Sequence, residues 1–380
     1  MKNNIIAMNY VILIILFVLI FFSFIYGMSV VHFEIFPFDF IKKLKISVLS
    51  DNNSIDNNSK IYENDFNSLI RFSTEDEILN TRSELTNYIW NHNLPKNTIP
   101  QIDSNIYDSN YDDLKNLKKI DRITTVMDFE INSISYLFVA EQSNNKLIIY
   151  HQGHSGDFLN GKNTIEFFLN KGYSVLAFSM PLLGMNNQPM IDSSNFGTIQ
   201  LTSHNHFKFI ESNNFSPIKF FVEPIFLSLN YVDKQFDFES YNFVGLSGGG
   251  WTAIIYSAID DRISDTYSIA GSVPISYRSI QQNFGDYEQT LPELYNIANY
   301  FELYLLSSYG DSRKLLQVFN KYDPCCFSGD YYIAYESVLQ KKLSDLNGDF
   351  EIFIDDTHKE HTISDSVLYL IDKSITPNLP

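Results

Sequence analysis

The stretch YNFVGLSGGGWTAIIYSAI, residues 241–259, decides the fold class of this chain. Its β-branched and aromatic start predicts a buried strand, and residues 250–262 predict a helix. Between them, residues 245–249, GLSGG, have the pattern G-x-S-x-G. On a sharp strand-to-helix turn this pattern exposes the serine oxygen, and the outer glycines avoid a steric collision across the turn. Ser247 is therefore a candidate catalytic nucleophile.

Two phosphate-binding interpretations fit the same glycines less well. A P-loop needs a lysine after its last glycine, and Trp251 follows Gly250 here. A dinucleotide-binding loop needs G-x-G-x-x-G in the first βα unit, whereas this turn belongs to a late one. A plain glycine-rich joint is the third alternative, and only partners for the serine further along the chain argue against it.

The chain around this turn alternates strands and helices. Runs rich in β-branched and aromatic residues predict eight strands, at 120–129, 134–140, 146–152, 173–181, 241–247, 265–274, 314–323 and 349–356. Helical patterns between most of them predict right-handed βαβ crossovers and a mainly parallel sheet, with an antiparallel start. Residues 276–291 fit neither pattern, and we expect a lid or binding insertion there.

An activated serine needs a base and an orienting acid, in the chain order serine, acid, histidine on such a sheet. His358 and His361 are the two histidines after Ser247, and both follow the last predicted strand. We prefer His361, which lies directly before the final predicted helix, and keep His358 as the alternative. The preferred acid is Asp323, at the end of the penultimate strand. Its competitors are Asp330 and two residues interpreted as an exposed turn pair, Asp355 and Asp356.

The oxyanion that forms during acyl transfer needs two N–H donors. Gly248 supplies the first, because it opens a helix whose N-terminus carries partial positive charge. The second is expected in the loop after the third predicted strand, YHQGHSGD, residues 150–157. Gly153 permits a close backbone approach there, so we predict the N–H of His154 as the second donor.

Histidine spacing raises one further possibility. His151 and His154, together with His204 and His206, have the spacing of metal ligands. Because the first two belong to the predicted oxyanion loop, and the second two precede a helix and fit the mouth of a pocket, we predict no metal site and no cofactor.

Together, Ser247 in GLSGG, the H-Q-G-H loop, Asp323 and His361 resemble the α/β-hydrolase superfamily, from roughly residue 90 to the C-terminus. The chain is most similar to serine esterases of the dienelactone-hydrolase and acetylxylan-esterase type. The resemblance implies about eight strands with helices on both faces, and a Ser-His-Asp triad that hydrolyses a small carboxylic ester through an acyl-enzyme. Gln152 departs from the family's loop, where glycine is common, and serine at position 247 argues against dienelactone hydrolysis itself.

Two other functions stay open. One is a serine peptidase or amidase on the same fold, and the other is a catalytically silent binding module. A nucleic-acid partner is disfavoured, because the net charge is −18 and no basic stripe occurs. The sequence does not fix an oligomeric state.

The N-terminal region predicts a single membrane-spanning helix at residues 5–31, after a tail at 1–4. No Asp, Glu, Lys or Arg lies between Lys2 and Glu34, and the run exceeds the roughly 20 apolar residues that span a bilayer. A cleaved signal peptide is the alternative. The short tail favours a non-cytoplasmic catalytic domain, whereas the lysines after the span favour the opposite.

The rest of the chain divides into three predicted parts. Residues 32–72 form a juxtamembrane segment and polar spacer, 73–118 a helical or irregular extension, and 119–380 the hydrolase domain. A capping box of Thr74 and Glu77 predicts the start of a helix in the extension.

Overall fold

The computed structural model describes Ser23 and residues 66–278, 283–325, 327–328, 331–344 and 346–376. Of the two compact units of the chain, Met1–Asp65 and Phe66–Pro380, the second contains nearly all of them. The predicted tail, almost all of the predicted anchor and most of the predicted spacer lie outside the described residues. Among the residues that are described, no helix has both the length and the apolar character that crossing a membrane requires.

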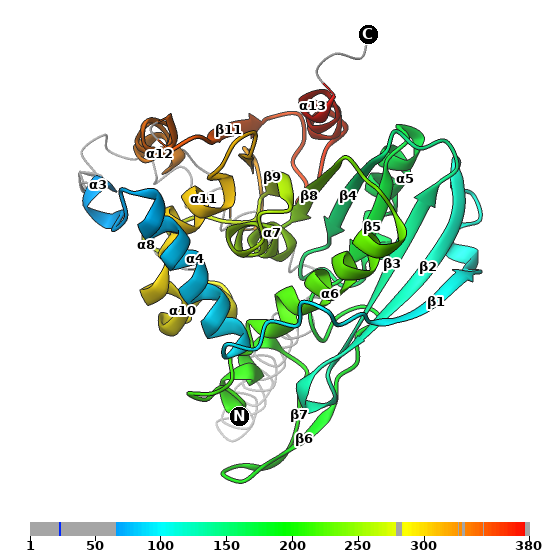
Figure 1. Ribbon diagram of the computed structural model, residues 1–380, viewed down its shortest axis with the longest axis horizontal. Coiled ribbons are helices and arrows are strands. Elements are labelled where there is room, and N and C mark those ends of the chain that lie inside the picture. Colours follow the sequence, from blue (N-terminus) through cyan, green and yellow to red (C-terminus); the bar gives the residue numbers. More distant parts are fainter. Residues whose placement is uncertain are drawn as a thin grey trace, which may run out of the picture. The chain divides into compact units, whose positions relative to one another are not determined.

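A nine-stranded sheet forms the centre of the Phe66–Pro380 unit, in the order β1-β2-β3-β5-β4-β8-β9-β10-β11 (Figure 1). β1, β2 and β3 pair antiparallel, as does β3 with β5, and the strands from β5 to β11 are mutually parallel. The strands of this sheet are β1 Gln101–Ile106, β2 Leu117–Val126, β3 Asn132–Ala140, β4 Lys146–His151, β5 Ser174–Phe178, β8 Ser240–Leu246, β9 Ile263–Ile269, β10 Lys314–Asn320 and β11 Asp349–Asp355.

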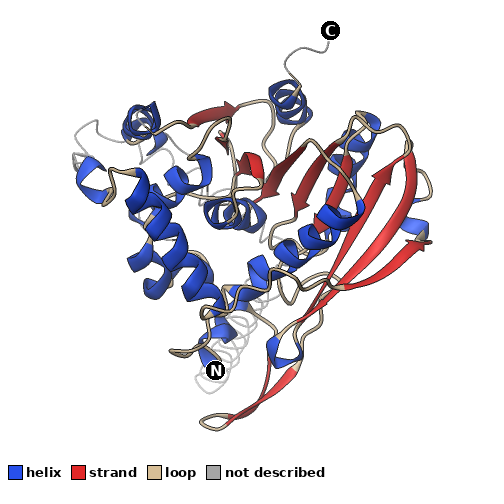
Figure 2. Ribbon diagram, in the orientation of Figure 1, coloured by secondary structure: helices blue, strands red, loops and turns tan. Residues whose placement is uncertain are grey.

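The eight predicted strands and the antiparallel start are confirmed, and β1 is an additional strand at the edge. Its sequence, QIDSNI, is largely polar and partly to fully exposed, so no apolar pattern marks it. A separate hairpin of β6 (Met190–Ser193) and β7 (Gly197–Gln200) projects from the main sheet (Figure 2).

Helices surround the sheet. The α-helices are α3 Phe66–Leu69, α4 Glu75–Trp90, α5 Lys162–Asn170, α6 Lys219–Gln235, α7 Gly248–Ile259, α8 Ile275–Arg278, α9 Tyr287–Thr290, α10 Pro292–Ile297, α11 Tyr300–Ser308, α12 Glu336–Ser344 and α13 Asp365–Ile375. The 3-10 helices are η1 Ser109–Tyr111, η2 Asp128–Glu130, η3 Phe158–Gly161, η4 His204–Phe209 and η5 Tyr331–Ala334.

Both faces of the sheet are covered by helices. Side chains alternate between the two faces along each buried strand, so each strand places apolar residues on both. In β4, Leu147 and Ile149 pack into one apolar cluster, and Ile148 and Tyr150 pack into another. Helices α4, α6, α7 and α11 contribute to the first cluster, and α5 and α13 to the second (Figure 1). The predicted arrangement of helices on both faces is therefore confirmed.

The segment just before the predicted extension belongs to the compact unit. Phe66 falls in the predicted spacer, yet it is buried, and its ring centroid lies 5.2 Å from that of Phe301. Arg71 makes a 2.6 Å ion pair with Glu302 of α11, whose carboxylate is buried. Residues from Phe66 onward are therefore part of the folded domain.

The predicted insertion, residues 276–291, contains the end of α8 and all of α9. α9 packs against η4, where the ring centroids of Tyr287 and Phe207 lie 6.2 Å apart. This contact brings Glu288 of the insertion beside His204 of η4.

Candidate functional site

Ser247 occupies the sharp turn between β8 and α7. Its φ of 56° and ψ of −125° form a strained conformation, which costs on the order of 1–3 kcal/mol. A Cβ on Gly245 would lie 2.2 Å from the carbonyl oxygen of Gly249, and a Cβ on Gly249 would lie 2.1 Å from that of His151. Both positions therefore require glycine, for the steric reason that the sequence pattern predicts.

The loop after β4 runs beside this turn, because β4 and β8 are adjacent, parallel and end in register. Gly153 touches the candidate nucleophile, since a Cβ on Gly153 would lie 2.5 Å from the Cβ of Ser247. The imidazole of His154 abuts Gly248, where a Cβ would lie 2.4 Å from the ring Cε1. The loop chosen for the second oxyanion donor thus lies next to both Ser247 and the first residue of α7.

Gln152, the residue that departs from the family's loop, is buried and braces this loop. Its side-chain amide donates a 2.8 Å hydrogen bond to Oγ of Ser155, and its Oε1 accepts one from the Tyr150 hydroxyl. His151 lies in the core, with its ring centroid 6.0 Å from that of Phe178. Burial lowers the pKa of His151 to about 4, so this imidazole is neutral at pH 7.

Asp323 and His361, the preferred acid and base, form a close pair. Oδ2 of Asp323, just after β10, lies 2.6 Å from Nδ1 of His361, in the loop between β11 and α13. The other carboxylate oxygen accepts the N–H of Cys325 at 2.7 Å. Because the carboxylate accepts, Nδ1 carries a proton, and in the neutral ring Nε2 is the nitrogen with the lone pair. The competing acid Asp330 lies outside the described residues.

Nε2 of His361 is buried and has no hydrogen-bond partner among the described residues, Ser247 included. Ser247 nevertheless lies at the same sheet edge, because β8, β9, β10 and β11 are consecutive and parallel, and Ser247, Asp323 and His361 all follow their carboxyl ends. The structure brings the acid and base into contact and positions the serine on the edge that they share.

The alternative base, His358, faces a different carboxylate. Its Nε2 lies 3.2 Å from Oδ2 of Asp355, outside hydrogen-bond geometry. Asp355 is fully buried, so its assignment to an exposed turn was wrong; the adjacent Asp356 is exposed. Burial alone would raise the pKa of Asp355, but hydrogen bonds from Ser364 and Thr357 outweigh it and lower that pKa.

A second group of histidines and carboxylates adjoins the predicted oxyanion loop. The spacing of His154 and His204 raised the possibility of a metal site that we did not predict, and the sequence did not connect either histidine to a carboxylate. Nε2 of His154 lies 3.1 Å from Nδ1 of His204, 3.1 Å from Oδ2 of Asp286 and 3.2 Å from Oε1 of Glu288. Nδ1 of His204 lies 3.2 Å from Oε2 of Glu288. We call these four residues the histidine–carboxylate cluster.

In the histidine–carboxylate cluster, neighbouring charged groups together affect the pKa values of His204 and Glu288 more than burial does. Burial alone would lower the pKa of His204, but the charge of Glu288 raises it. Burial alone would raise the pKa of Glu288, but the charge of His204 holds it well below its usual range. The signals in the sequence were H-x-H at 204–206 and two acidic residues inside the insertion. These residues lie far apart in the sequence, and only the packing of α9 against η4 brings them together.

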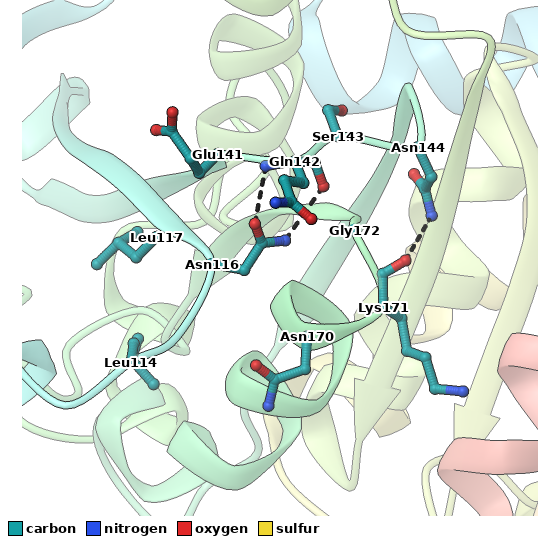
Figure 3. A pocket seen from close by; sticks show the side chains of 10 residues that line it. All are labelled: Leu114, Asn116, Leu117, Glu141, Gln142, Ser143, Asn144, Asn170, Lys171 and Gly172. Atoms are coloured by element: carbon teal, nitrogen blue, oxygen red, sulfur yellow. Dashed lines mark hydrogen bonds between the residues drawn. The ribbon is translucent and has the colours of Figure 1, made fainter.

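A surface pocket of about 680 Å³ lies at the opposite edge of the sheet. Its lining includes residues 141–144, which precede β4, and residues 170–172, which precede β5 (Figure 3). Asn116 exchanges hydrogen bonds with the backbone of Gln142, and Asn144 donates to the carbonyl of Lys171. These polar groups hold the loops together, and the candidate site residues do not line this pocket.

Comparison with known proteins places the fold. No family model matches the chain, and no curated protein matches it in sequence. Acetyl xylan esterase 1 from Thermoanaerobacterium sp. JW/SL YS485 aligns with a TM-score of 0.54 and 11% identity, over 81% of this chain and 97% of its own. An acetyl xylan esterase from Paenibacillus sp. R4 aligns with a TM-score of 0.51 and 14% identity, over 81% of this chain and 96% of its own.

A methylesterase aligns with a TM-score of 0.52 and 10% identity, over 82% of this chain and 66% of its own. Identities this low establish the fold rather than the reaction. The strand order, the Ser247 turn and these three alignments agree, and the chain has the α/β-hydrolase fold of these esterases.

Proposed function

We propose that this chain is a carboxylic-ester hydrolase with Ser247 as its nucleophile. The observation that carries the proposal is the Asp323–His361 pair, whose unpaired Nε2 lies at the sheet edge that also presents Ser247. A histidine oriented by a carboxylate through Nδ1 and unpaired at Nε2 is suited to activate a serine hydroxyl. The esterase names of the structural neighbours support an ester as the substrate.

In the first half of the proposed reaction, Oγ of Ser247 attacks the ester carbonyl carbon while Nε2 of His361 takes its proton. The C–O bond to the alcohol then breaks, and His361 returns the proton to the departing oxygen. Asp323 stabilises the imidazolium and keeps its Nδ1–H oriented. The product of this half is an acyl group on Ser247 and a free alcohol.

In the second half, a water molecule gives a proton to His361 and attacks the acyl carbon. The bond to Ser247 breaks, Oγ regains the proton, and a carboxylic acid leaves. In both halves the carbonyl oxygen becomes negative, and we propose that the N–H groups of Gly248 and His154 bind it. Each such donor is worth about 10²–10³ in kcat in enzymes of known mechanism.

The test is hydrolysis of p-nitrophenyl acetate by the full chain and by Ser247→Ala, with circular dichroism to verify the fold of both. The proposal predicts that the variant folds but loses hydrolysis. Unchanged hydrolysis in a folded variant rejects Ser247. A panel of matched esters, amides and peptides then separates an esterase from a peptidase, and a folded wild type that attacks none of them is a silent binding module.

We also propose that residues 5–31 anchor the chain in a membrane, with the hydrolase domain on the non-cytoplasmic side. The support is the charge-free run between Lys2 and Glu34 and the short tail before it. An anchored chain stays with the membranes in an alkaline wash, and protease added to intact cells degrades its hydrolase domain. Release by the wash contradicts the anchor, and mass spectrometry of the N-terminus then detects signal-peptide cleavage.

A further inference from the structure

The histidine–carboxylate cluster has the composition and spacing of a metal site. One ligand atom from each of His154, His204, Asp286 and Glu288 lies within 4.8 Å of the other three. Zn²⁺ takes four nitrogen and oxygen ligands at about 2.0–2.2 Å in tetrahedral geometry, which separates neighbouring ligand atoms by about 3.3–3.6 Å. The contacts of 3.1–3.2 Å in the cluster are close to that spacing.

A hydrogen bond to the backbone orients the imidazole of His204. Nε2 of His204 lies 2.9 Å from the carbonyl oxygen of Pro181, which only accepts, so this nitrogen carries the proton. When a cation displaces the second proton, Nδ1 presents its lone pair to the cluster. A histidine that donates its other N–H to a backbone carbonyl is the usual arrangement of a metal ligand. Nε2 of His154 meanwhile has three polar neighbours for at most one proton.

The environment of the Glu288 carboxylate independently favours a cation at this position. Its side chain has no exposed surface, and neither carboxylate oxygen has a hydrogen-bond partner among the described residues. The two oxygens lie 3.2 Å from imidazole nitrogens, but outside hydrogen-bond geometry. A buried carboxylate without hydrogen bonds is strongly unfavourable, and a bound cation compensates it.

We propose that His154, His204, Asp286 and Glu288 bind one Zn²⁺ ion. Two imidazoles and two carboxylates fill a tetrahedral site without an open position, so the site is structural. The ion would join three segments: the predicted oxyanion loop, η4, and the part of the insertion that contains α9 and the residue before it. Because the ring of His154 abuts Gly248, the ion also fixes this loop against the start of α7.

The first test is the metal content of the full chain, purified without chelators and measured by inductively coupled plasma mass spectrometry. We expect one Zn²⁺ per chain, and its loss in Glu288→Gln and His204→Gln. The matched control is His206→Gln. Nδ1 of His206 accepts the N–H of Thr202 at 3.2 Å, so this residue is engaged outside the cluster and its variant keeps the ion.

The second test uses only the wild-type chain, in case the variants do not fold. After removal of metal with a chelator, stoichiometric Zn²⁺ raises Tm by several degrees, because a ligand that binds the native state stabilises it. Co²⁺ in the same site gives the visible absorption of a four-coordinate ion. Either response, lost in folded Glu288→Gln, supports the site.

Three results overturn the proposal: a wild type that neither contains Zn²⁺ nor responds to added Zn²⁺ or Co²⁺, full zinc content in both cluster variants, or equal loss of zinc in His206→Gln. None of these measurements uses hydrolysis. Failure of the zinc site and failure of the Ser247 proposal are therefore distinguishable.

Discussion

Two histidine–carboxylate groups lie on either side of β8, and they differ in what they leave unpaired. In the Asp323–His361 pair, the carboxylate engages Nδ1, and Nε2 has no hydrogen-bond partner. In the histidine–carboxylate cluster, both nitrogens of His204 and Nε2 of His154 face polar atoms at 2.9–3.2 Å. An unpaired imidazole nitrogen is available for proton transfer, whereas imidazoles that face several polar atoms from different segments are suited to hold those segments together. We therefore propose a catalytic role for the Asp323–His361 pair and a structural role for the histidine–carboxylate cluster.

The largest effect is expected from the base. His361→Gln keeps a polar side chain of similar size but cannot take a proton from Ser247, so kcat for p-nitrophenyl acetate should fall about 10⁴-fold or more. His358→Gln is the matched control, since His358 faces Asp355 instead, and its kcat should change little. The opposite result, with loss only in His358→Gln, would make His358 the base.

A smaller effect is expected at Gly248, which follows Ser247 and contacts the ring of His154. In Gly248→Ala the new methyl group collides with the ring of His154, 2.4 Å away at Cε1, and shifts the proposed oxyanion N–H. We expect kcat to fall about 10–10²-fold, less than for a donor removed outright.

Adding His154→Ala removes the ring that Gly248→Ala strikes and keeps the backbone N–H of residue 154. Because His154→Ala also removes a proposed zinc ligand, His154→Ala alone is the reference. Gly248→Ala should lower kcat less in that background than in the wild type, and a double-mutant cycle measures the difference. An equal cost of Gly248→Ala with and without the His154 ring means that this contact does not govern the rate.

The smallest effect concerns stability. The pKa of Asp355 is lowered in the folded chain, so its carboxylate adds stability that is present above the unfolded pKa of about 3.9 and lost as pH falls below it. Asp355→Asn should lower the free energy of unfolding at pH 7 by about 1–3 kcal/mol. In denaturant titrations, the difference in free energy of unfolding between Asp355→Asn and wild type should narrow as the pH falls below about 4, down to a lower limit of about pH 3.

The exposed neighbour provides the control for this titration. Asp356→Asn should change stability by less than about 0.5 kcal/mol at any of these pH values. An Asp355→Asn variant whose deficit is independent of pH contradicts the role given to the ionised carboxylate.

Features that are formed by residues close together in the chain could be predicted from the sequence. The capping box of Thr74 and Glu77 is present at the start of α4 as predicted, because both partners lie within one turn. The turn at Ser247 was predictable for a similar reason, since the glycines that it needs are its near neighbours in the chain. Asp323 and His361 lie 38 residues apart, and only the chain order expected of this fold paired them.

Features that depend on tertiary packing were not predictable. β1 has no apolar alternation, because the edge position lets its polar side chains face solvent. The sequence suggested a turn at Asp355, because it does not show that Thr357 and Ser364, which follow β11, donate hydrogen bonds to this carboxylate. The histidine–carboxylate cluster joins His154 to His204, 50 residues on, and to an insertion without a clear pattern of its own.

The most direct test of the central claim is the position of covalent labelling by a fluorophosphonate on the full 380-residue chain. We expect one adduct, located on Ser247 by peptide mass spectrometry, absent in Ser247→Ala and formed far more slowly in His361→Gln. A folded wild type that forms no adduct, or forms it on another residue, would contradict the assignment of Ser247 as the nucleophile.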